Sequence, residues 1–338
     1  MILVYGVTGY TGRLIAERAC RRGLDVVVAG RNAERVGAIA KGLGVSHRAF
    51  DVDDARGLAG ASVVLNCAGP FVETASRLSR ACIAAKVHYL DLAGEVAEIE
   101  AVRSLDEVAR AAGAMLMPAV GFGVVPTDCV AALLAAKVPG ATWLSLAFQT
   151  VGGVSRGTLR TVLTDVHRDG VARRDGRLVP MGPGVSQRRI DLGAGETTVV
   201  TNPWRGDLVT AYSTTKIPNI DTFTAFPPPV RWLMSAGWLL DQPIVQRILT
   251  ALVARAPEGP SDAERAKGRS YVWGEVRDDG GRRAVACLEG PEAYEFTAQT
   301  AVDIAARVAR GEARPGFQTP AGMFGASIVE ADNVRIRA

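Results

Sequence analysis

The first thirty residues constrain the fold more than any other part of this chain. Residues 1–5 are a short apolar run, and Gly-Val-Thr-Gly-Tyr-Thr-Gly follows directly at residues 6–12. Residues 13–22 have the apolar period of a helix, Gly23 suits its end, and residues 24–29 are a second apolar run. This order of strand, glycine turn, helix and strand predicts a βαβ unit that binds a dinucleotide, with the pyrophosphate at the helix N-terminus.

The three glycines of this turn have different expected tasks. Gly6 turns the chain, Gly9 lets the backbone approach a phosphate, and Gly12 lets the helix pack close to the sheet. A turn whose glycines are purely structural is the alternative. The predicted cofactor contacts in and after the turn are Gly6, Thr8, Gly9, Tyr10, Thr11, Gly12 and Arg13.

The end of the second strand indicates which dinucleotide binds. An NAD site usually carries an acidic residue about 20 residues after the turn, where it binds the ribose 2′-hydroxyl. This chain has Gly30-Arg31-Asn32 at that place. Arg31 would pair with a 2′-phosphate, and Arg13 could reach the same group. We therefore predict NADP as the cofactor, with Arg31 and Asn32 in its site. The alternative is that Arg31 is a solvated residue that opens the next helix.

Strands and helices continue to alternate to about residue 120, and ligands bind at the carboxyl ends of such strands. Asp51 follows a third strand at 46–50 and is a candidate for the adenine amino group, or it merely belongs to a helix cap. Asp91 ends a fifth strand and is a candidate substrate contact. A fourth strand at 61–66 leads into further predicted cofactor contacts, which are Asn66, Ala68, Gly69, Pro70 and Phe71.

Composition excludes several classes of function. The 338 residues carry a net charge of +4, and the basic residues form no runs, so nucleic acid is not an expected partner. Five scattered cysteines and three histidines predict neither a metal site nor a disulfide framework. Residues 232–240 are the most apolar stretch and are too short to span a membrane. We expect a cytoplasmic protein without a leader segment.

From residue 141 the pattern changes to a mixed sheet with fewer helices. The predicted strands are 143–151, 189–192, 197–201, 207–216, 222–226, 270–276 and 283–288, and the predicted helices are 159–168, 230–240, 244–255 and 294–310. We therefore expect an α/β protein with three parts. These are a doubly wound Rossmann domain at 1–122, a mixed-sheet substrate and dimerisation domain at 123–300, and a C-terminal segment at 301–338 that returns to the Rossmann domain.

Motifs in both halves together resemble the saccharopine dehydrogenase-like family of NADP-dependent oxidoreductases, nearest to the trans-acting enoyl reductases. They are the glycine turn at 6–12, Ala-Gly-Arg-Asn at 29–32, Asn-Cys-Ala-Gly-Pro-Phe at 66–71, Tyr-Leu-Asp-Leu-Ala-Gly-Glu at 89–95, Ser-Arg-Gly-Thr at 155–158, Lys-Ile-Pro-Asn-Ile at 216–220, Gly-Pro-Glu-Ala-Tyr at 290–294 and Thr-Pro-Ala at 319–321. The resemblance implies hydride transfer from NADPH to a carbon–carbon or carbon–nitrogen double bond. Gly123-Val124 and Lys216 depart from the family pattern and put the substrate in doubt.

The catalytic candidates are Tyr212 and Lys216. Their Y-x-x-x-K spacing occurs in short-chain reductases on a helix, but here the stretch is rich in β-branched residues and predicts a strand. Four residues along a strand would separate the two by about 13 Å, so we expect Lys216 to act singly as electrophile or proton donor. Ser155, Arg156 and Thr158 open a helix, where they could seat an anionic group or act as a simple cap.

The function favoured by these patterns is an NADPH-dependent reductase that acts on the C=C bond of a hydrophobic or acyl substrate, free or bound to a carrier. A homodimer is expected. The alternatives are a reductase of imines of the saccharopine type and a non-catalytic NADP-binding regulator.

Overall fold

The computed structural model of this chain describes residues 1–165, 169–193, 195–228, 231 and 242–338. The chain divides into two compact units. Unit 1 contains Met1–Val125 and Tyr294–Ile328, and unit 2 contains Pro126–Ala293 and Val329–Ala338.

Unit 1 is built on a seven-stranded sheet in the order β15-β6-β5-β4-β1-β2-β3. All neighbouring strands in it run parallel. The order reverses between β1 and β4, and this is the switch point at which open α/β sheets bind their ligands. The strands are β1 (Ile2–Tyr5), β2 (Val26–Gly30), β3 (Ser46–Ala49), β4 (Val63–Asn66), β5 (His88–Asp91), β6 (Met115–Met117) and β15 (Gly316–Phe317).

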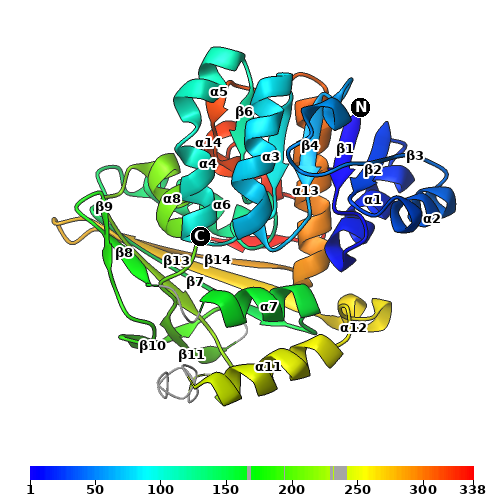
Figure 1. Cartoon of the computed structure of the whole chain (residues 1–338). Helices are drawn as coiled ribbons and strands as arrows, with labels where there is room; N and C mark the ends of the chain where they lie inside the picture. The colour runs from blue at the N-terminus through cyan, green and yellow to red at the C-terminus, as the bar shows by residue number, and fades with distance from the viewer. Residues whose placement is uncertain (166–168, 194, 229–230, 232–241) are drawn as a thin grey trace. The chain divides into compact units, whose positions relative to one another are not determined.

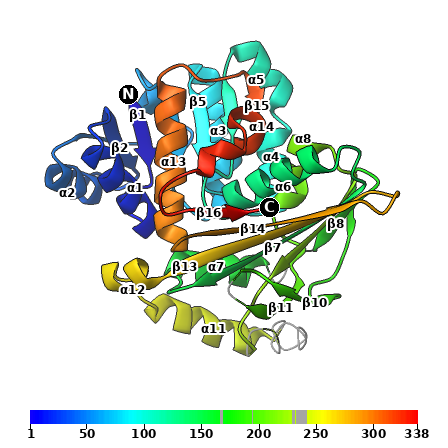
Figure 2. The same cartoon turned by 180° about the vertical axis from the view of Figure 1, so that it is seen from behind.

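Helices cover both faces of this sheet and so bury its strands. Helices α3 and α4 lie on the face turned to the viewer in Figure 1, and α13 and α14 lie on the face turned to the viewer in Figure 2. The predicted doubly wound Rossmann fold is confirmed. The helices that fall mainly in unit 1 are α1 (Tyr10–Arg21), α2 (Ala33–Leu43), η1 (Ala55–Leu58), α3 (Phe71–Ala85), α4 (Val96–Arg103), α5 (Asp106–Ala112), α13 (Ala293–Ala309), α14 (Pro320–Phe324) and η2 (Ala326–Val329).

The long helix α13 returns to unit 1 after the second sheet. The Arg18 guanidinium on α1 pairs with the Glu295 carboxylate on α13 at 2.6 Å, and the Tyr10 and Tyr294 rings meet edge to face at 5.2 Å. The rest of the expected C-terminal segment is divided. Strand β15 joins the sheet of unit 1, whereas β16 (Arg335–Arg337) pairs with β14 in unit 2.

Unit 2 is built on a mixed sheet, as predicted. Its main path is β10-β11-β12-β7-β13-β14-β16, and β8 and β9 branch from β12. Strands β7 and β12 run parallel, and the other pairs run antiparallel. The strands before β16 are β7 (Trp143–Val151), β8 (Val171–Arg174), β9 (Arg177–Pro180), β10 (Gln187–Asp191), β11 (Glu196–Thr201), β12 (Asn219–Thr224), β13 (Arg269–Arg277) and β14 (Arg283–Pro291).

Helix α6 packs on this sheet so closely that Gly274 on β13 has no room for a side chain. A Cβ at Gly274 would lie 2.6 Å from Val130 Cγ1 on α6. Helices α7 and α11 lie side by side in both cartoon views (Figures 1 and 2). The helices are α6 (Val125–Lys137), α7 (Arg156–Asp165), α8 (Asp207–Thr215), α11 (Pro243–Arg255) and α12 (Asp262–Lys267).

The largest error of sequence interpretation concerns residues 207–216, which form helix α8 and not a strand. The Ser213 and Thr215 hydroxyls donate to the backbone carbonyls of Val209 and Ala211, at 2.8 and 2.6 Å. Hydroxyl groups that bond back to the preceding turn are compatible with a helix. β-Branched propensity is a weak preference, and the tertiary contacts of α8 override it.

Smaller differences have local causes. The stretch before β6 breaks at Ser104-Leu105 into two helices, α4 and α5. Ser261 and Glu264 form a capping box that starts α12. Helix α11 begins at Pro243, one residue ahead of its predicted start, with Gln242 as its N-cap, and α6 begins at Val125. The predicted helix at 230–240 lies outside the described residues, apart from Arg231.

The hairpin of β8 and β9 was missed, although an Asp-Gly turn joins its strands. Asp175 and Gly176 have φ angles of +47° and +76°. Two successive positive φ values are typical of the tight turn that Asp-Gly favours in hairpins.

Candidate cofactor-binding site

The glycine turn between β1 and α1 is shaped by close backbone contacts. Gly6 has a φ of +91°, and a Cβ there would lie 2.6 Å from the backbone nitrogen of Ala68. A Cβ at Gly12 would lie 2.5 Å from the Gly6 carbonyl oxygen. At Gly9 a Cβ would meet only the Gly6 carbonyl oxygen, at 3.5 Å. Packing within unit 1 therefore requires Gly6 and Gly12, whereas Gly9 borders open space.

Gly9 is also the N-cap of α1, and no side chain caps this helix. The Gly9 N–H donates to the Gly6 carbonyl at 3.1 Å, which fixes the turn ahead of the helix. An uncapped first turn directs its N–H groups and the positive end of the helix dipole toward an anion. Thr8, Tyr10 and Thr11 flank this position and are half-buried.

Two arginines flank the turn with free guanidinium groups. Arg31 follows the last residue of β2, and Arg13 lies in the first turns of α1; both side chains are exposed. Within the described part of the chain, neither guanidinium has a hydrogen bond or an ion pair. Asn32 caps α2, because its Oδ1 accepts a hydrogen bond from the Arg35 backbone nitrogen at 2.9 Å. The cap leaves the Asn32 amide nitrogen available for a ligand.

Asp51, the candidate for the adenine amino group, pairs with Arg77 of α3. An Arg77 nitrogen lies 3.0 Å from an Asp51 carboxylate oxygen, and Arg77 also binds Asp53. The hydrogen bond from Arg77 lowers the pKa of Asp53. Asp54 caps η1, as the simpler interpretation of this acidic stretch predicted. Asp51 remains exposed beside β3, so a contact with adenine stays a prediction.

The loop after β4 lies against the glycine turn. Tyr5 and Asn66 are paired in register on β1 and β4, and the Cys67 N–H donates to the Tyr5 carbonyl at 2.8 Å. Gly6 and Ala68 are therefore in backbone contact, which brings two sets of predicted cofactor residues together. In this loop Gly69 and Pro70 are exposed and Phe71 is half-buried.

A buried polar network lies beside this loop and includes two of the predicted site residues, Asn66 and Asp91. Asn66 donates to the hydroxyls of Thr74 and Tyr89, at 3.2 and 3.1 Å, and its Oδ1 accepts from the Ala68 N–H at 3.0 Å. Asp91 accepts from the Tyr89 hydroxyl at 2.8 Å. The Asn66 and Asp91 side chains are completely buried.

Asp91 also holds the two loops that follow β5 and β6. Its Oδ1 accepts from the backbone nitrogens of Ala93 and Ala119, at 2.9 and 2.8 Å. Both carboxylate oxygens thus accept hydrogen bonds within unit 1, and a direct contact between Asp91 and substrate stays a prediction. The Asn66 side chain likewise organises the loop, and its contact with the cofactor stays a prediction.

Burial dominates the electrostatics of this network. It raises the pKa of Asp91 to about 6, although the hydrogen bonds from Ala119, Ala93 and Tyr89 act in the opposite direction. Burial likewise raises the pKa of Tyr89 and of the Cys67 thiol, and the nearby Asp91 charge adds to both shifts. Sequence reasoning missed Tyr89. The signal was present, because Tyr89 and Asp91 are two residues apart and therefore share one side of a buried strand.

In unit 2, the catalytic candidates lie one helical turn apart. Tyr212 is on α8 and Lys216 is its C-cap, with the Lys216 ammonium 5.7 Å from the centre of the Tyr212 ring. The expected separation along a strand was wrong. The Arg173 guanidinium also stacks on the Tyr212 ring at 4.1 Å, and the Tyr212 hydroxyl packs against Gly176. Tyr212 thus anchors the hairpin of β8 and β9, while Lys216 is exposed.

The predicted anion-binding group in unit 2, at the start of α7, has the geometry of a helix cap. Ser155 Oγ accepts a hydrogen bond from the Thr158 N–H at 3.2 Å at the start of α7. The Arg156 guanidinium pairs with the Glu258 carboxylate at 3.4 Å. These contacts favour the capping interpretation of Ser155, Arg156 and Thr158.

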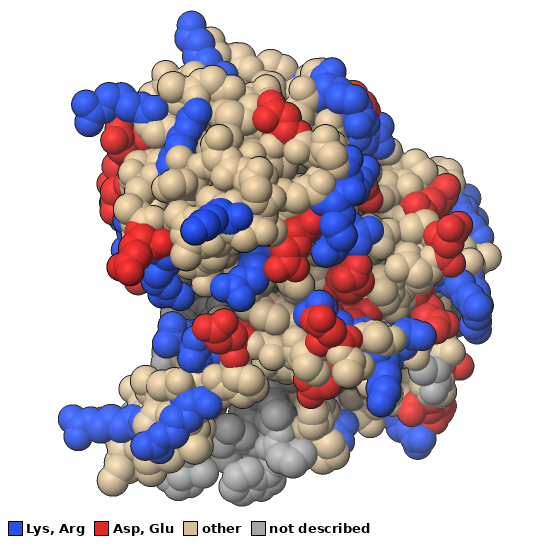
Figure 3. Space-filling view, turned by 90° about the vertical axis from the view of Figure 1, so that its right-hand side faces the viewer, with Lys and Arg blue, Asp and Glu red and all other residues tan. Residues whose placement is uncertain are grey.

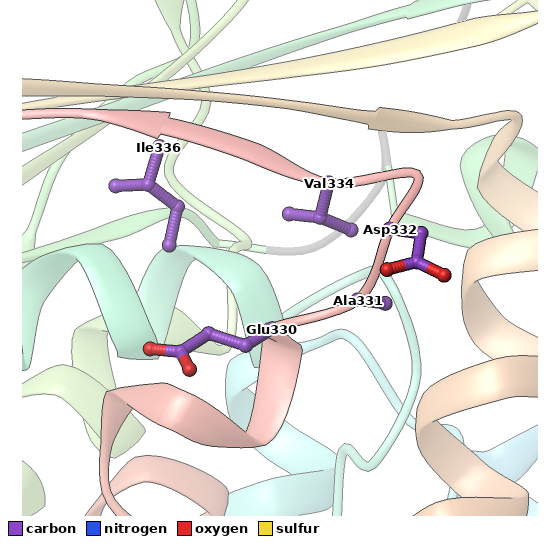
Figure 4. A pocket seen from close by; sticks show the side chains of 5 residues that line it. All are labelled: Glu330, Ala331, Asp332, Val334 and Ile336. Carbon is purple, nitrogen blue, oxygen red and sulfur yellow. The ribbon is translucent and has the colours of Figure 1, made fainter.

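A surface pocket of about 490 Å³ lies in the C-terminal stretch of unit 2. Figure 4 shows its lining residues Glu330, Ala331, Asp332, Val334 and Ile336. None of the predicted cofactor or substrate residues lines it. On the face shown in Figure 3, basic and acidic side chains are interspersed. Within the described part of the chain, none of the helices combines the length and apolar character that crossing a membrane requires.

Comparison with known proteins supports the interpretation of unit 1. Residues 2–117 match the family model for the saccharopine dehydrogenase NADP binding domain. This match confirms the predicted NADP-binding domain and the resemblance to saccharopine dehydrogenase-like oxidoreductases. The structure also resembles apo saccharopine dehydrogenase (L-Glu forming) from Saccharomyces cerevisiae, with a TM-score of 0.65 over 97% of this chain and 95% of that chain. The sequence identity in that comparison is 13%, so it shows a shared fold alone.

Sequence relatives carry the names of oxidoreductases. A Mycobacterium tuberculosis protein provisionally named as a trans-acting enoyl reductase is 34% identical over 196 residues, which are 51% of this chain and 46% of that protein. The trans-acting enoyl reductase of Mycobacterium leprae is 33% identical over 141 residues, which are 38% of this chain and 33% of that protein. The matches thus span less than half the length of these relatives.

Proposed function

We propose that the whole chain is an NADPH-dependent reductase, whose residues 2–117 match the family model for the saccharopine dehydrogenase NADP binding domain. Its substrate is a hydrophobic or acyl compound with a C=C bond, free or bound to a carrier. The relatives named as trans-acting enoyl reductases support this substrate class over half of the chain. The observation that carries the proposal is the uncapped N-terminus of α1 beside the free guanidinium groups of Arg13 and Arg31.

The residues of unit 1 fit the cofactor. The backbone at Gly9 and the first turn of α1 would bind the pyrophosphate, and Arg31 would bind the 2′-phosphate. Residues 67–71, which contact the glycine turn at the switch point, would border the nicotinamide half. NADPH supplies a hydride when it is bound. The task of the chain is to hold the acceptor carbon at the correct distance and to supply a proton at the other end of the double bond.

Lys216 is the proposed proton donor, because it carries an exposed ammonium at the C-cap of α8. Tyr212 is the weaker candidate, since the Arg173 guanidinium stacks on its ring and its hydroxyl lies close to the Gly176 turn. Replacement of Lys216 by Met should lower kcat and leave the Kd for NADPH unchanged. A lower kcat together with a raised Kd would instead indicate a structural role for Lys216.

Three arginines of unit 2 are paired with acidic side chains, so these three are less available to a carboxylate-bearing imine. Arg174 pairs with Asp221 at 2.6 Å, and Arg205 pairs with Asp207 at 2.5 Å. Arg188 pairs with Glu275 at 3.4 Å. A dicarboxylate substrate would need such groups unpaired to bind it.

The test is titration of the protein with NADPH and NADH. Loss of a charged hydrogen bond in Arg31→Ala should weaken NADPH binding roughly 10- to 150-fold and leave NADH binding unchanged. Arg21→Ala is the matched control, because Arg21 is exposed at the opposite end of α1. If neither nucleotide binds, the proposal fails. Binding without oxidation of NADPH by any enoyl substrate would favour the regulator.

A further inference from the structure

A continuous chain of hydrogen bonds links helix α3 to strands β4 and β5. It runs from Thr74 through Asn66 and Tyr89 to Asp91, with links of 3.2, 3.1 and 2.8 Å. We call these four residues the relay. Asn66, Tyr89 and Asp91 are buried, and all four lie in unit 1. The relay therefore joins α3 to two neighbouring strands, β4 and β5, at the edge where open α/β sheets bind ligands.

One end of the relay fixes the loop that contacts the glycine turn. Ala68 is held at both backbone groups, since its N–H donates to Asn66 Oδ1 at 3.0 Å and its carbonyl accepts from Thr74 Oγ1 at 2.6 Å. Ala68 is also the residue that a Cβ at Gly6 would strike. A shift of Asn66 or Thr74 would therefore move the backbone against which the phosphate-binding turn is packed.

The other end of the relay holds a strained segment. Asp91 accepts from Ala119, whose φ of +64° is uncommon for a residue with a Cβ. The Val120 N–H donates to the Asp91 carbonyl at 2.8 Å, and the Val120 carbonyl accepts from the Thr300 hydroxyl at 2.9 Å. Strain of this kind persists only where the surroundings fix it. Asp91 thus sets the path of residues 118–120.

We propose that Asp91 is a positioning residue, which acts through the relay to hold residues 67–70, 92–95 and 118–124 in the geometry that binds NADPH, and does so only while its carboxylate is ionised. The inference rests on the proposed binding of NADPH to unit 1. It assigns Asp91 a role that requires no contact with substrate.

The direction of the hydrogen bonds explains why ionisation matters. Ionised Asp91 accepts at both oxygens, from Tyr89 at Oδ2 and from two backbone nitrogens at Oδ1. A proton on Oδ2 would face the Tyr89 hydroxyl hydrogen, and one of the two O–H groups would lose its acceptor. The Tyr89 oxygen already accepts from Asn66, so protonation disturbs the relay from Asp91 back to Asn66.

The groups that face Asp91 leave its protonation adjustable. Tyr89 on β5 donates to it, and the acid Glu98 on α4 raises its pKa. The Cys67 thiol of the loop after β4 interacts with the Asp91 charge, and Cys82 of α3 interacts with Tyr89. Among the described residues, no Lys or Arg has a hydrogen bond or ion pair with the Asp91 carboxylate. Burial without a cation partner raises the pKa of Asp91 to about 6.

The experiment is a fluorescence titration of the full chain with NADPH at several pH values, from roughly pH 5 to pH 8, for wild type and Asp91→Asn. The 2′-phosphate of NADPH itself takes up a proton at about pH 6. Protonation of the ligand affects binding to both proteins equally, so the ratio of their Kd values for NADPH isolates the contribution of Asp91. At the highest pH we expect Asp91→Asn to bind NADPH about tenfold more weakly than wild type does. At the lowest pH the two Kd values should become nearly equal. A ratio that does not change with pH would overturn the proposal.

Tyr89→Phe provides an independent test. It removes the hydroxyl that stabilises the ionised carboxylate, so the midpoint of the pH dependence should move upward. Tyr5→Phe is the matched control, because its buried hydroxyl on β1 donates to the Phe50 carbonyl at 3.0 Å and does not touch the relay. Its midpoint should match that of wild type. If the pH midpoint of Tyr89→Phe equals that of wild type, the proposed role of the relay is wrong. If wild type does not bind NADPH at all, the proposed function is wrong as well.

Discussion

Asp91 in unit 1 and Asp207 in unit 2 are both completely buried, and they are stabilised in opposite ways. Asp207 pairs with the Arg205 guanidinium at 2.5 Å and accepts a hydrogen bond from the Thr127 hydroxyl. The Arg205 guanidinium also stacks on the Phe148 ring at 4.2 Å. The partners of Asp91 are a tyrosine hydroxyl and two backbone N–H groups, with no cation.

The difference in partners makes Asp207 a fixed structural contact, whereas the protonation of Asp91 can change with pH. A buried ion pair holds the start of α8 in place, and the loss of either partner leaves an uncompensated charge. A buried carboxylate that depends on neutral donors is in balance between two protonation states near neutral pH. Unit 2 therefore uses its buried aspartate for stability, whereas unit 1 places one where a change of protonation can alter the backbone of a binding site.

The largest expected effect comes from Asp207→Ala. It removes the carboxylate that pairs with the buried Arg205 guanidinium and should lower the free energy of unfolding by about 3–5 kcal/mol. Glu196→Ala is the control, because it removes an exposed ion pair with Arg189 at 2.6 Å in the same unit. That change should cost about 0–1 kcal/mol. Urea denaturation measures both, and equal losses would mean that the buried pair has no special part in holding unit 2 together.

Asp91→Asn tests whether the buried carboxylate without a cation partner changes its protonation with pH. The pKa of Asp91 in the folded protein is about 6, above the value of about 3.9 for a free aspartate. Its contribution to stability is therefore complete below about pH 4 and is lost as the pH rises through the folded-state value. The gap of about two pH units corresponds to about 3 kcal/mol.

The stability of Asp91→Asn relative to wild type should accordingly rise by up to about 3 kcal/mol between about pH 4 and about pH 8. Denaturation curves at a series of pH values measure this difference. This change of the stability difference with pH has the opposite sign to that expected for a carboxylate that pairs with a cation. Replacement of such a carboxylate destabilises the protein most at high pH. A difference that falls with rising pH would show that Asp91 is stabilised in its charged form after all.

A third prediction separates structural from binding glycines within unit 1. Gly12→Ala places a Cβ 2.5 Å from the Gly6 carbonyl oxygen, and overpacking of this kind costs about 1–3 kcal/mol. Gly9→Ala meets nothing nearer than 3.5 Å and should leave stability nearly unchanged. It should still weaken NADPH binding, since its Cβ occupies the space for the phosphate. Thermal unfolding and NADPH titration of both variants distinguish packing at Gly12 from phosphate binding at Gly9. Equal losses of stability in the two variants would contradict this division.

The sequence predicted unit 1 well because its signals are local. The turn at 6–12, the strands on either side and the period of α1 are adjacent in the chain, and Gly6 and Gly12 meet only backbone that the βαβ unit itself brings close. The relay was not predicted, because it depends on which strands are neighbours and how their ends are aligned. Asn66 and Asp91 were noticed singly, but the register that pairs them on β4 and β5 is a property of the folded sheet.

Unit 2 was harder to predict because its contacts are distant in the chain. Helix α8 was read as a strand from its threonines, yet Asp207 at its start is held by Thr127, which lies 80 residues earlier. Composition alone does not contain that contact. The Asp175-Gly176 turn and the capping box at Ser261 were different cases, since their local signals were present and were overlooked.

The smallest expected effect compares two helix caps, one in each unit. Asn32 caps α2 in unit 1, and Ser261 caps α12 in unit 2 through a capping box with Glu264. Replacing either cap with Ala should cost about 1 kcal/mol, because one N–H group of the helix loses its acceptor. Only Asn32→Ala should also weaken NADPH binding, by a few-fold, since Asn32 adjoins Arg31 and its amide nitrogen is available to the cofactor. Denaturation and NADPH titration of both variants decide this. If Asn32→Ala lowers stability and leaves the Kd for NADPH unchanged, Asn32 is a helix cap alone, and the 2′-phosphate site consists of the two arginines.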